Sequence, residues 1–293
     1  MSFNSYQENN IINFRQYKEI YSLEREYFQL QYENEIKTIL VNLKNLLEKN
    51  KYLEEKPLEK GPYGDMQYEI ALLADKFILE SIREKFGDCN IISEESENQL
   101  DNGKKHFIIT DPIDGSLNAV KRIPFYSSTI LIAKGSKFSD IKAAGTIDLI
   151  NGDIFIANEK EARLNDEIIS PSRKNKVDDA LISIDIKIRN SEGKEWLKRL
   201  ENILATSKSI RTMGSAALET AYVSAGRIDA FISPAMQLRI FDCLPSIFIA
   251  KTAGASIRFF EPNLDDINFF KTKKIGYCVA ANEDLLEDIN NHI

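Results

Sequence analysis

The stretch Phe107–Asn118, which reads FIITDPIDGSLN, decides how we interpret the rest of the chain. It starts with apolar and β-branched residues, a composition that predicts a buried strand. Two carboxylates follow, Asp111 and Asp114, with a proline between them, and then Gly115 and Ser116. Carboxylates at the end of a strand, beside a turn with free backbone N–H groups, are able to bind hard cations and a phosphate together. A Pro-Asp turn with solvated acids explains the same letters, so such a site needs further acids elsewhere in the chain.

The composition is ordinary for a soluble globular protein. The 293 residues are 43% hydrophobic and 28% charged, and this length suits one large domain or two medium ones. The net charge of −7 argues against a general nucleic-acid binder, because such proteins present a broad basic face. A small phosphorylated substrate stays possible if metal ions neutralise its charge.

Cysteine and histidine chemistry is poorly represented. Cys89, Cys243 and Cys278 are far apart and form no C-x-x-C pair, which indicates neither a zinc site nor a disulfide framework. With only His106 and His292, a histidine-based triad or metal centre is hard to build. The polar N-terminus lacks a signal core, and no apolar run reaches membrane length. We therefore expect a cytoplasmic protein without a membrane partner.

The expected secondary structure changes character along the chain. The first half shows helical periodicity at Ile12–Asn50 and Asp65–Phe86, then strands at Asn90–Ser93, Lys105–Asp111, Phe125–Ala133, Ala143–Leu149 and Asp153–Asn158. The second half alternates between strands at Ala180–Ile186, Lys208–Thr212, Ala230–Ile232, Ser256–Phe259 and Tyr277–Ala280 and helices at Glu195–Ala205, Ser215–Ala225 and Cys243–Ala253. We predict an N-terminal α+β subdomain, residues 1–172 with a short N-terminal extension, and a C-terminal α/β subdomain, residues 173–293.

A second pair of acids follows the strand Asn90–Ser93. Glu94 and Glu95 are adjacent, so a strand would direct them to opposite faces and at most one would face a given site. A solvated turn is the alternative interpretation.

Two features of the second half bear on the same site. The small residues Met213–Ala217 open a predicted helix, whose free N–H groups suit a phosphate or polar substrate group. Close helix packing explains these small residues as well. Asp242 stands near the start of another predicted helix, as a helix cap or as an acid that joins the site from the second subdomain.

Together these residues resemble the inositol monophosphatase and fructose-1,6-bisphosphatase superfamily of metal-dependent, lithium-sensitive phosphatases. The resemblance covers roughly Asp65 to Ala281, and its motifs are Ser93–Ser96, Asp111–Ser116, Gly214–Ala217 and Phe241–Asp242. The segments Leu117–Phe125 and Ala217–Phe231 look most like archaeal members, several of which act on both inositol phosphates and fructose bisphosphate. The resemblance implies an α+β fold, the layered α-β-α-β-α sandwich of sugar phosphatases, and a homodimer.

The resemblance also implies a metal site. Glu94, Asp111 and the Ile113 carbonyl would hold one Mg²⁺, and Asp111, Asp114 and Asp242 a second. Oxygen ligands suit Mg²⁺, and two such ions can clamp the attacking water and the leaving oxygen. A third ion is part of the family's pattern, and Mn²⁺ is an expected substitute.

The substrate residues are implied in the same way. Gly115 and Ser116 would bind the ester phosphate through their N–H groups, and the Ser116 hydroxyl would lie near the attacking water. We therefore expect Glu94, Asp111, Asp114 and Ser116 to be catalytic. The expected substrate-binding residues are Gly115, Ser116, Gly214, Ser215 and Arg239.

The chain departs from the family's pattern at two positions. Ala71 stands where an aspartate usually helps to bind the third metal, and Glu69 and Asp75 lie two and four residues away from it. Ala235 stands where inositol monophosphatases carry an acid, which weakens the case for inositol phosphate. Arg239 either contacts a second phosphate or sugar hydroxyl, or covers the start of a helix at the surface.

We therefore expect a Mg²⁺-dependent phosphomonoesterase that hydrolyses a small sugar or inositol phosphate, namely fructose 1,6-bisphosphate, inositol monophosphate or both, by metal-activated water. Two alternatives remain open. One is a nucleotide phosphatase of the 3′-phosphoadenosine 5′-phosphate type. The other is a metal- and phosphate-binding relative with weak catalysis, because position 71 is alanine.

Overall fold

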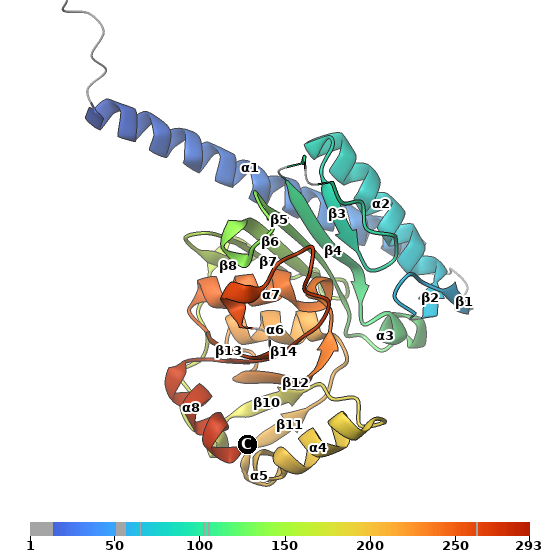
Figure 1. Ribbon diagram of the computed structural model, residues 1–293, viewed down its shortest axis with the longest axis vertical. Coiled ribbons are helices and arrows are strands. Elements are labelled where there is room, and N and C mark those ends of the chain that lie inside the picture. Colours follow the sequence, from blue (N-terminus) through green and yellow to red (C-terminus); the bar gives the residue numbers. More distant parts are fainter. Residues whose placement is uncertain (1–13, 51–56, 65, 102, 105, 262) are drawn as a thin grey trace, which may run out of the picture.

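The computed structural model describes residues 14–50, 57–64, 66–101, 103–104, 106–261 and 263–293, and contains two main sheets layered with helices (Figure 1). The first sheet has the strand order β3-β4-β5-β6-β7-β8-β9. These strands are β3 (Asn90–Ser93), β4 (Phe107–Asp114), β5 (Ser127–Ala133), β6 (Ile141–Asp148), β7 (Ile154–Asn158), β8 (Ala162–Leu164) and β9 (Glu167–Ile168). The second sheet has the order β11-β10-β12-β14-β13. Its strands are β10 (Leu181–Ile184), β11 (Ser209–Arg211), β12 (Ala230–Leu238), β13 (Ser256–Glu261) and β14 (Ile275–Ala280).

Helices cover both sheets and separate them. They are α1 (Phe14–Lys49), α2 (Glu69–Phe86), α3 (Ser116–Lys121), α4 (Ser191–Arg199), α5 (Glu201–Thr206), α6 (Ala216–Ser224), α7 (Ile240–Ala253) and α8 (Glu283–His292). Helices α1 and α2 pack on one face of the first sheet, α6 and α7 lie between the sheets, and α5 and α8 pack on the outer face of the second. This order of layers confirms the predicted α+β fold, the α-β-α-β-α sandwich.

Short elements complete the structure. Strands β1 (Pro57–Lys60) and β2 (Met66–Tyr68) form an antiparallel ribbon, and three single 3₁₀ turns are η1 (Phe138–Asp140), η2 (Val177–Asp179) and η3 (Leu264–Asp266). The ribbon lies next to α3 at one end of the first sheet (Figure 1).

Strand β4 shows why its apolar run becomes a central strand. Ile108 packs into the core under α1 and α2, whereas Phe107 and Ile109 pack into the core that contains α6 and α7. Successive side chains of a strand point to opposite faces, so a strand between two helical layers must be apolar at every position. The continuous run before Asp111 meets this requirement.

Helix α1 packs through one apolar stripe. Ile36, Leu40, Leu43 and Leu47 are buried against the first sheet and α2. Their spacing of three and four residues places them on one face of a helix. The predicted helix Ile12–Asn50 is thus present as α1, and its first two predicted residues lie outside the described part of the chain.

Two predicted boundaries were wrong because the residues near them pair with another strand. Helix α2 begins at Glu69 and not near Asp65, because β2 pairs with β1 over the preceding residues. Strand β4 does not end at Asp111 but continues to Asp114, which pairs with Ser127 of β5. Strand partners come from elsewhere in the chain, so local pattern does not reveal them.

Helices were also misjudged near the C-terminus. The single helix predicted at Glu195–Ala205 is two helices, α4 and α5, which meet at Leu200. Helix α8 was not predicted, although Asn282 is a strong N-cap signal and its side chain accepts a 3.0 Å hydrogen bond from the Leu285 N–H.

The three cysteines are buried free thiols, in line with the expectation of no disulfide framework. No helix in the described ranges is long and apolar enough to cross a bilayer. The division at residue 172 stays a prediction.

Candidate active site

A bulge in β4 places two acids on the same side of the first sheet. Asp111 pairs with Thr129 and Asp114 with Ser127, so three steps of β4 match two steps of β5. On a regular strand, residues three apart face opposite ways, and one extra residue reverses that alternation. Both carboxylates consequently face the layer that contains α6 and α7.

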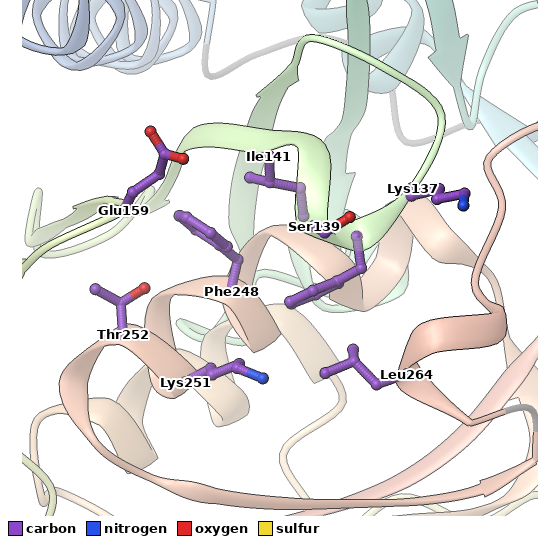
Figure 2. A pocket seen from close by; sticks show the side chains of 9 residues that line it. Lys137, Ser139, Ile141, Glu159, Phe248, Lys251, Thr252 and Leu264 are labelled. Atoms are coloured by element: carbon purple, nitrogen blue, oxygen red, sulfur yellow. The ribbon is translucent and has the colours of Figure 1, made fainter. Parts of the chain in front are cut away.

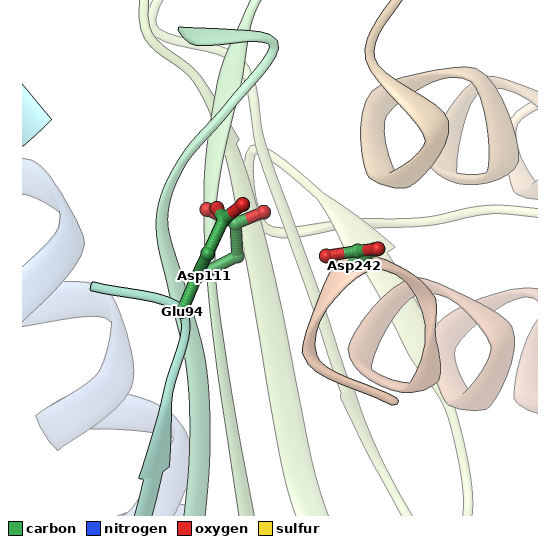
Figure 3. A group of neighbouring side chains, drawn as sticks. All are labelled: Glu94, Asp111 and Asp242. Carbon is green, nitrogen blue, oxygen red and sulfur yellow. The ribbon is translucent and has the colours of Figure 1, made fainter. Parts of the chain in front are cut away.

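Three carboxylates meet at this point. Glu94 follows the end of β3, Asp111 belongs to β4, and Asp242 lies in the first turn of α7. One ligand oxygen of each lies within 4.8 Å of the other two (Figure 3). Segments from both halves of the sequence thus contribute to one group of acids, Glu94, Asp111 and Asp242, which we call the acid cluster.

The acid cluster is electrostatically unfavourable without a cation. Burial, and then repulsion by Asp242, raises the pKa of Glu94 well above its usual value. Burial and repulsion by Glu94 do the same to the pKa of Asp111, and burial raises the pKa of Asp242 to about 7. Buried carboxylates that repel one another require a positive partner. An all-oxygen set of acids fits a hard divalent cation.

Asp242 reconciles the two interpretations of its sequence position. Its Oδ2 accepts a 2.7 Å hydrogen bond from the Arg239 N–H, so it caps the start of α7. The same carboxylate belongs to the acid cluster. The helix begins at Ile240, earlier than the predicted Cys243, because Asp242 itself completes the cap.

Asp114 lies beside the acid cluster and is bonded to α6. Its Oδ2 accepts hydrogen bonds from the Ser215 hydroxyl at 2.5 Å and from the Ala217 N–H at 2.8 Å. Burial outweighs these bonds and raises the pKa of Asp114 to about 7. Asp114 is outside the set whose ligand atoms meet within 4.8 Å, so its predicted role in a second metal site stays a prediction.

The two glycine-containing motifs lie against each other. Gly115 has φ +86°, and a Cβ at this position would come within 3.0 Å of the Gly214 carbonyl oxygen. The Asn118 side chain donates 2.7 Å hydrogen bonds to the carbonyls of Phe125 and Met213. Sequence reasoning assigned no role to Asn118, which ties α3 to the segment before α6. Phosphate binding by Gly115 and by Ser116 stays a prediction.

Ser215 has both donors engaged within the protein. Its hydroxyl bonds Asp114, and its N–H donates to Glu219 Oε2 at 3.3 Å. In the structure it therefore holds Asp114 in place. Its predicted contact with substrate, like that of the exposed Gly214, is untested.

Arg239 points into the site. Its Nη2 donates a 2.9 Å hydrogen bond to the Tyr63 carbonyl, and its Nη1 lies 3.9 Å from Glu94 Oε1. The guanidinium also lies over the ring of Tyr63, 5.2 Å from the centroid. Arg239 thereby joins the turn between β1 and β2 to the acid cluster. Its predicted contact with substrate stays a prediction.

Neither acid that lies near position 71 in the sequence, Glu69 or Asp75, belongs to the acid cluster. Ala71 is fully buried, Glu69 is exposed, and Asp75 accepts a 2.5 Å hydrogen bond from the Ser93 hydroxyl. Glu95 accepts a 2.9 Å bond from Gln67 Nε2 and lines the same pocket as Glu94 and Ser116. The prediction that at most one of these adjacent acids would face a given site was therefore wrong: β3 ends at Ser93, so the alternation of a strand does not extend to Glu94 and Glu95.

The edge of the second sheet adds polar groups that sequence reasoning missed. Asp185 follows β10 and accepts a 3.1 Å bond from Gln237 Nε2, and the Lys187 N–H donates to Gln237 Oε1 at 3.0 Å. The charge of Asp185 contributes to the raised pKa of Asp114, and that of Lys187 acts to lower the pKa of Asp242. Charged residues directly after a strand were the available signal.

Glu219 was also missed. It is fully buried, accepts hydrogen bonds from Ser183 and from the Met213 and Ser215 N–H groups, and its pKa is raised by burial to about 7. It stabilises the backbone that carries Ser215. A glutamate in the first turn of a helix was the only signal.

Comparison with known proteins decides the family. The model of the inositol monophosphatase family matches residues 24–293. The chain belongs to the inositol monophosphatase family. It is therefore a phosphatase that hydrolyses phosphomonoesters, and the predicted superfamily and enzyme class are confirmed.

Relatives of this family member include archaeal enzymes. It is similar to a fructose-1,6-bisphosphatase of Pyrococcus furiosus, with 31% identity over 78% of this chain and 84% of that one. It is also similar to a bifunctional NADP phosphatase/NAD kinase of Methanococcus maripaludis, with 29% identity over 71% of this chain and 40% of that one. Among solved structures, an extragenic suppressor protein suhB of Bartonella henselae superposes with a TM-score of 0.77 and 26% identity, covering 88% of this chain and 96% of that one.

Proposed function

We propose that this member of the family is a Mg²⁺-dependent phosphomonoesterase for a small sugar or inositol phosphate, with fructose 1,6-bisphosphate and inositol monophosphate as its substrate class. The acid cluster carries the proposal. Glu94, Asp111 and Asp242 come from three separate elements, and their ligand atoms lie within 4.8 Å of one another. Folding does not need three carboxylates so close together, whereas an oxygen-loving divalent ion does.

The residues that would hold the ions are those that the family resemblance implies. Glu94, Asp111 and the Ile113 carbonyl would hold one Mg²⁺, and Asp111, Asp114 and Asp242 a second. When bound, the ions supply Lewis-acid stabilisation of the phosphate charge and activation of the attacking water. Because burial and repulsion disfavour the charged acids, the site is prepared to accept positive charge.

The protein's own groups would do the positioning. The N–H groups of Gly115 and Ser116, at the turn after Asp114, would hold the ester phosphate. The Ser116 hydroxyl would orient the water opposite the leaving oxygen. Asp114 would be kept in its orientation by Ser215 and Ala217. Such prior positioning lowers the barrier because few groups must reorganise during the reaction.

The second sheet would recognise the leaving group. Asp185 and Gln237 are bonded to each other at the edge of the second sheet, and the charges of Asp185 and Lys187 act on Asp114 and Asp242, respectively. A carboxylate and an amide suit the hydroxyl groups of a sugar or inositol. This arrangement would supply the polyol contacts that Ala235 is unable to make.

A nucleotide phosphate is the second candidate. The relative from Methanococcus maripaludis is named as an NADP phosphatase in part of its length. Arg239 would then contact a second phosphate of the nucleotide.

Phosphate release from a substrate panel tests the proposal. Purified protein with Mg²⁺ is given fructose 1,6-bisphosphate, inositol 1-phosphate, 3′-phosphoadenosine 5′-phosphate and NADP⁺, with and without Li⁺ and with Mn²⁺ in place of Mg²⁺. We expect the highest kcat/KM with one of the two polyol phosphates. A higher kcat/KM with a nucleotide would select the second candidate, and no release from any compound would exclude both.

Asp185→Asn supplies a matched test of the leaving-group side. We expect KM for the preferred polyol phosphate to rise several-fold with little change in kcat, because the metal ligands remain. Asp178→Asn, an exposed acid in η2, is the control. Equal kinetics for both variants would contradict this part of the proposal.

The predicted homodimer is also a proposal, supported by the family resemblance. Light scattering of the eluted peak gives the mass in solution, and a monomer at micromolar concentration would contradict it.

A further inference from the structure

A second cavity opens at the other end of α7 from the acid cluster. It has a volume of about 620 Å³ and is formed by η1, β6, η3 and the last turns of α7 (Figure 2). Asp242 and Lys251 are nine residues apart on α7, which corresponds to about 14 Å along a helix axis. The cavity is therefore separate from the catalytic site.

The floor of the cavity is aromatic and aliphatic. Phe138 and Phe248 lie with their ring centroids 6.1 Å apart, and Ile141 and Leu264 complete the apolar lining. In Figure 2, Phe248, Ile141 and Leu264 surround the same space. Small-molecule sites commonly combine such apolar walls with a few polar groups in a volume of this size.

Two of the three charged groups that line the cavity are basic. Lys251 Nζ lies 5.8 Å from the centroid of the Phe138 ring, and Lys137 lines the same cavity. Within the described part of the chain, neither ammonium group forms an ion pair. The acid in the lining, Glu159, is bonded to Lys142 at 2.7 Å, so its charge is largely compensated.

We propose that this cavity binds a small aromatic anion. Its flat apolar body would pack on Phe138 and Phe248, its single carboxylate, sulfonate or phosphate group would meet Lys251, and Lys137 would add positive charge at another side of the cavity. The aromatic walls match the flat shape of such a molecule, and the lysines in the lining match its negative charge.

The position of the cavity makes the lysines decisive. The C-terminal end of a helix carries partial negative charge and repels anions. An anion near the end of α7 is therefore attracted only through side chains, and Lys251 lies over the aromatic floor. If Lys251 served only to compensate the negative end of α7, its replacement would leave the affinity for such an anion unchanged.

The probe for the test is 1-anilinonaphthalene-8-sulfonate, followed by fluorescence titration of the full chain. We expect one probe molecule per chain. Lys251→Met keeps the apolar stem and should weaken binding at least tenfold. Thr252→Trp should fill the cavity and abolish binding. Lys198→Met, at a side chain that is 78% exposed on α4, should leave the affinity unchanged.

Competition separates this site from the catalytic one. Naphthalene-1-sulfonate should displace the probe, whereas equal concentrations of 1-naphthol, inorganic sulfate, or phosphate with Mg²⁺ should not. The inference is overturned if the wild-type chain does not bind the probe, or if the Lys251→Met and Thr252→Trp variants bind it with the same affinity as the wild type. Displacement of the probe by 1-naphthol, or by phosphate with Mg²⁺, would overturn it as well. Circular dichroism and melting temperature confirm that each variant is folded. The readout is binding, so it stands whether or not the proposed substrate class is right.

Discussion

Ser215 donates a 2.5 Å hydrogen bond to Asp114 across 101 positions of the chain. The bond connects the N-cap residue of helix α6 to the bulged strand β4. It also holds one acid of the site while the neighbouring Asp111 meets Glu94 and Asp242. The orientation of the candidate active site thus depends on how the two halves pack.

Removing this bond should affect both stability and metal binding. Ser215→Ala leaves the buried Asp114 with one strong donor fewer, which we expect to lower the free energy of unfolding by about 1–3 kcal/mol. The apparent Mg²⁺ affinity in the activity assay should fall as Asp114 loses its orientation. Urea unfolding and a Mg²⁺ titration measure the two effects. Ser139→Ala, at an exposed serine, is the control, and equal behaviour of both variants would disprove the positioning role.

Neutralising one carboxylate of the acid cluster should lower activity without lowering the stability of the metal-free protein. In EDTA, Asp111→Asn should melt at the same temperature as the wild type or higher, because it removes a repulsion between buried charges. Phosphate release should fall by a factor on the order of 100 or more, since a metal ligand is lost. The rise in melting temperature on adding Mg²⁺ should also disappear. Glu195→Gln on exposed α4 serves as the control; an active Asp111→Asn enzyme would refute the metal assignment.

The raised pKa values predict how stability depends on pH. The folded-state pKa values of Asp114 and Asp242 are about 7, above the ordinary value of 3.8, so the folded chain binds more protons than the unfolded chain between these values. Stability of the metal-free protein should therefore fall as pH rises from about 4 to about 7, and then level off. Metal affinity should rise over the same window, because protons compete for the ligands. Melting temperatures in EDTA and in saturating Mg²⁺ give both curves. A metal-free curve that rises from pH 4.5 to 7 would be incompatible with these pKa values.

The missing acid at position 71 can be restored. Ala71→Asp should lower the Mg²⁺ concentration needed for half-maximal activity, because it restores the carboxylate that the family usually carries at this position. In EDTA the variant should be less stable, since Ala71 is fully buried and an unpaired charge there is costly. Ala71→Asn, which has the same size without the charge, is the matched control. If both variants have the same Mg²⁺ dependence, position 71 has no part in binding the metal.

Arg239 should tune the metal site through charge. Its guanidinium lies 3.9 Å from Glu94 and competes with a metal for that acid. Arg239→Met keeps a long side chain over Tyr63 and removes the charge, so we expect tighter Mg²⁺ binding together with a raised KM for phosphorylated substrates. For Arg239→Lys we expect a Mg²⁺ affinity and a KM between those of the wild type and of Arg239→Met. Calorimetry and steady-state kinetics provide the readouts; an unchanged KM would exclude a contact between Arg239 and substrate.

Much of the candidate site was predictable from short motifs. Glu94 after β3, Asp111 and Asp114 at the end of β4, and Asp242 near the start of α7 were all identified as acids of one site, and the structure brings Glu94, Asp111 and Asp242 together. These signals are local, because a strand followed by acids or an acid at a helix start is defined by neighbours in the chain.

Other parts of the site were not predictable in this way. The bulge that turns Asp111 and Asp114 to one side depends on the register with β5. The bonds of Asn118 to Met213 and of Ser215 to Asp114 exist only once α6 is packed against the first sheet. None of these depends on the identity of adjacent residues alone.

The family, much of the alternation of strands and helices, and the acids that meet at the site were readable from the chain alone, since periodicity and short motifs are properties of neighbouring residues. The bond of Glu95 to Gln67, the position of Arg239 near Glu94 and the bond of Asp185 to Gln237 arise only when distant segments pack together. The tertiary structure also created the cavity at the far end of α7. These features arise where two sheets pack around shared helices, and such packing joins residues that no local pattern relates.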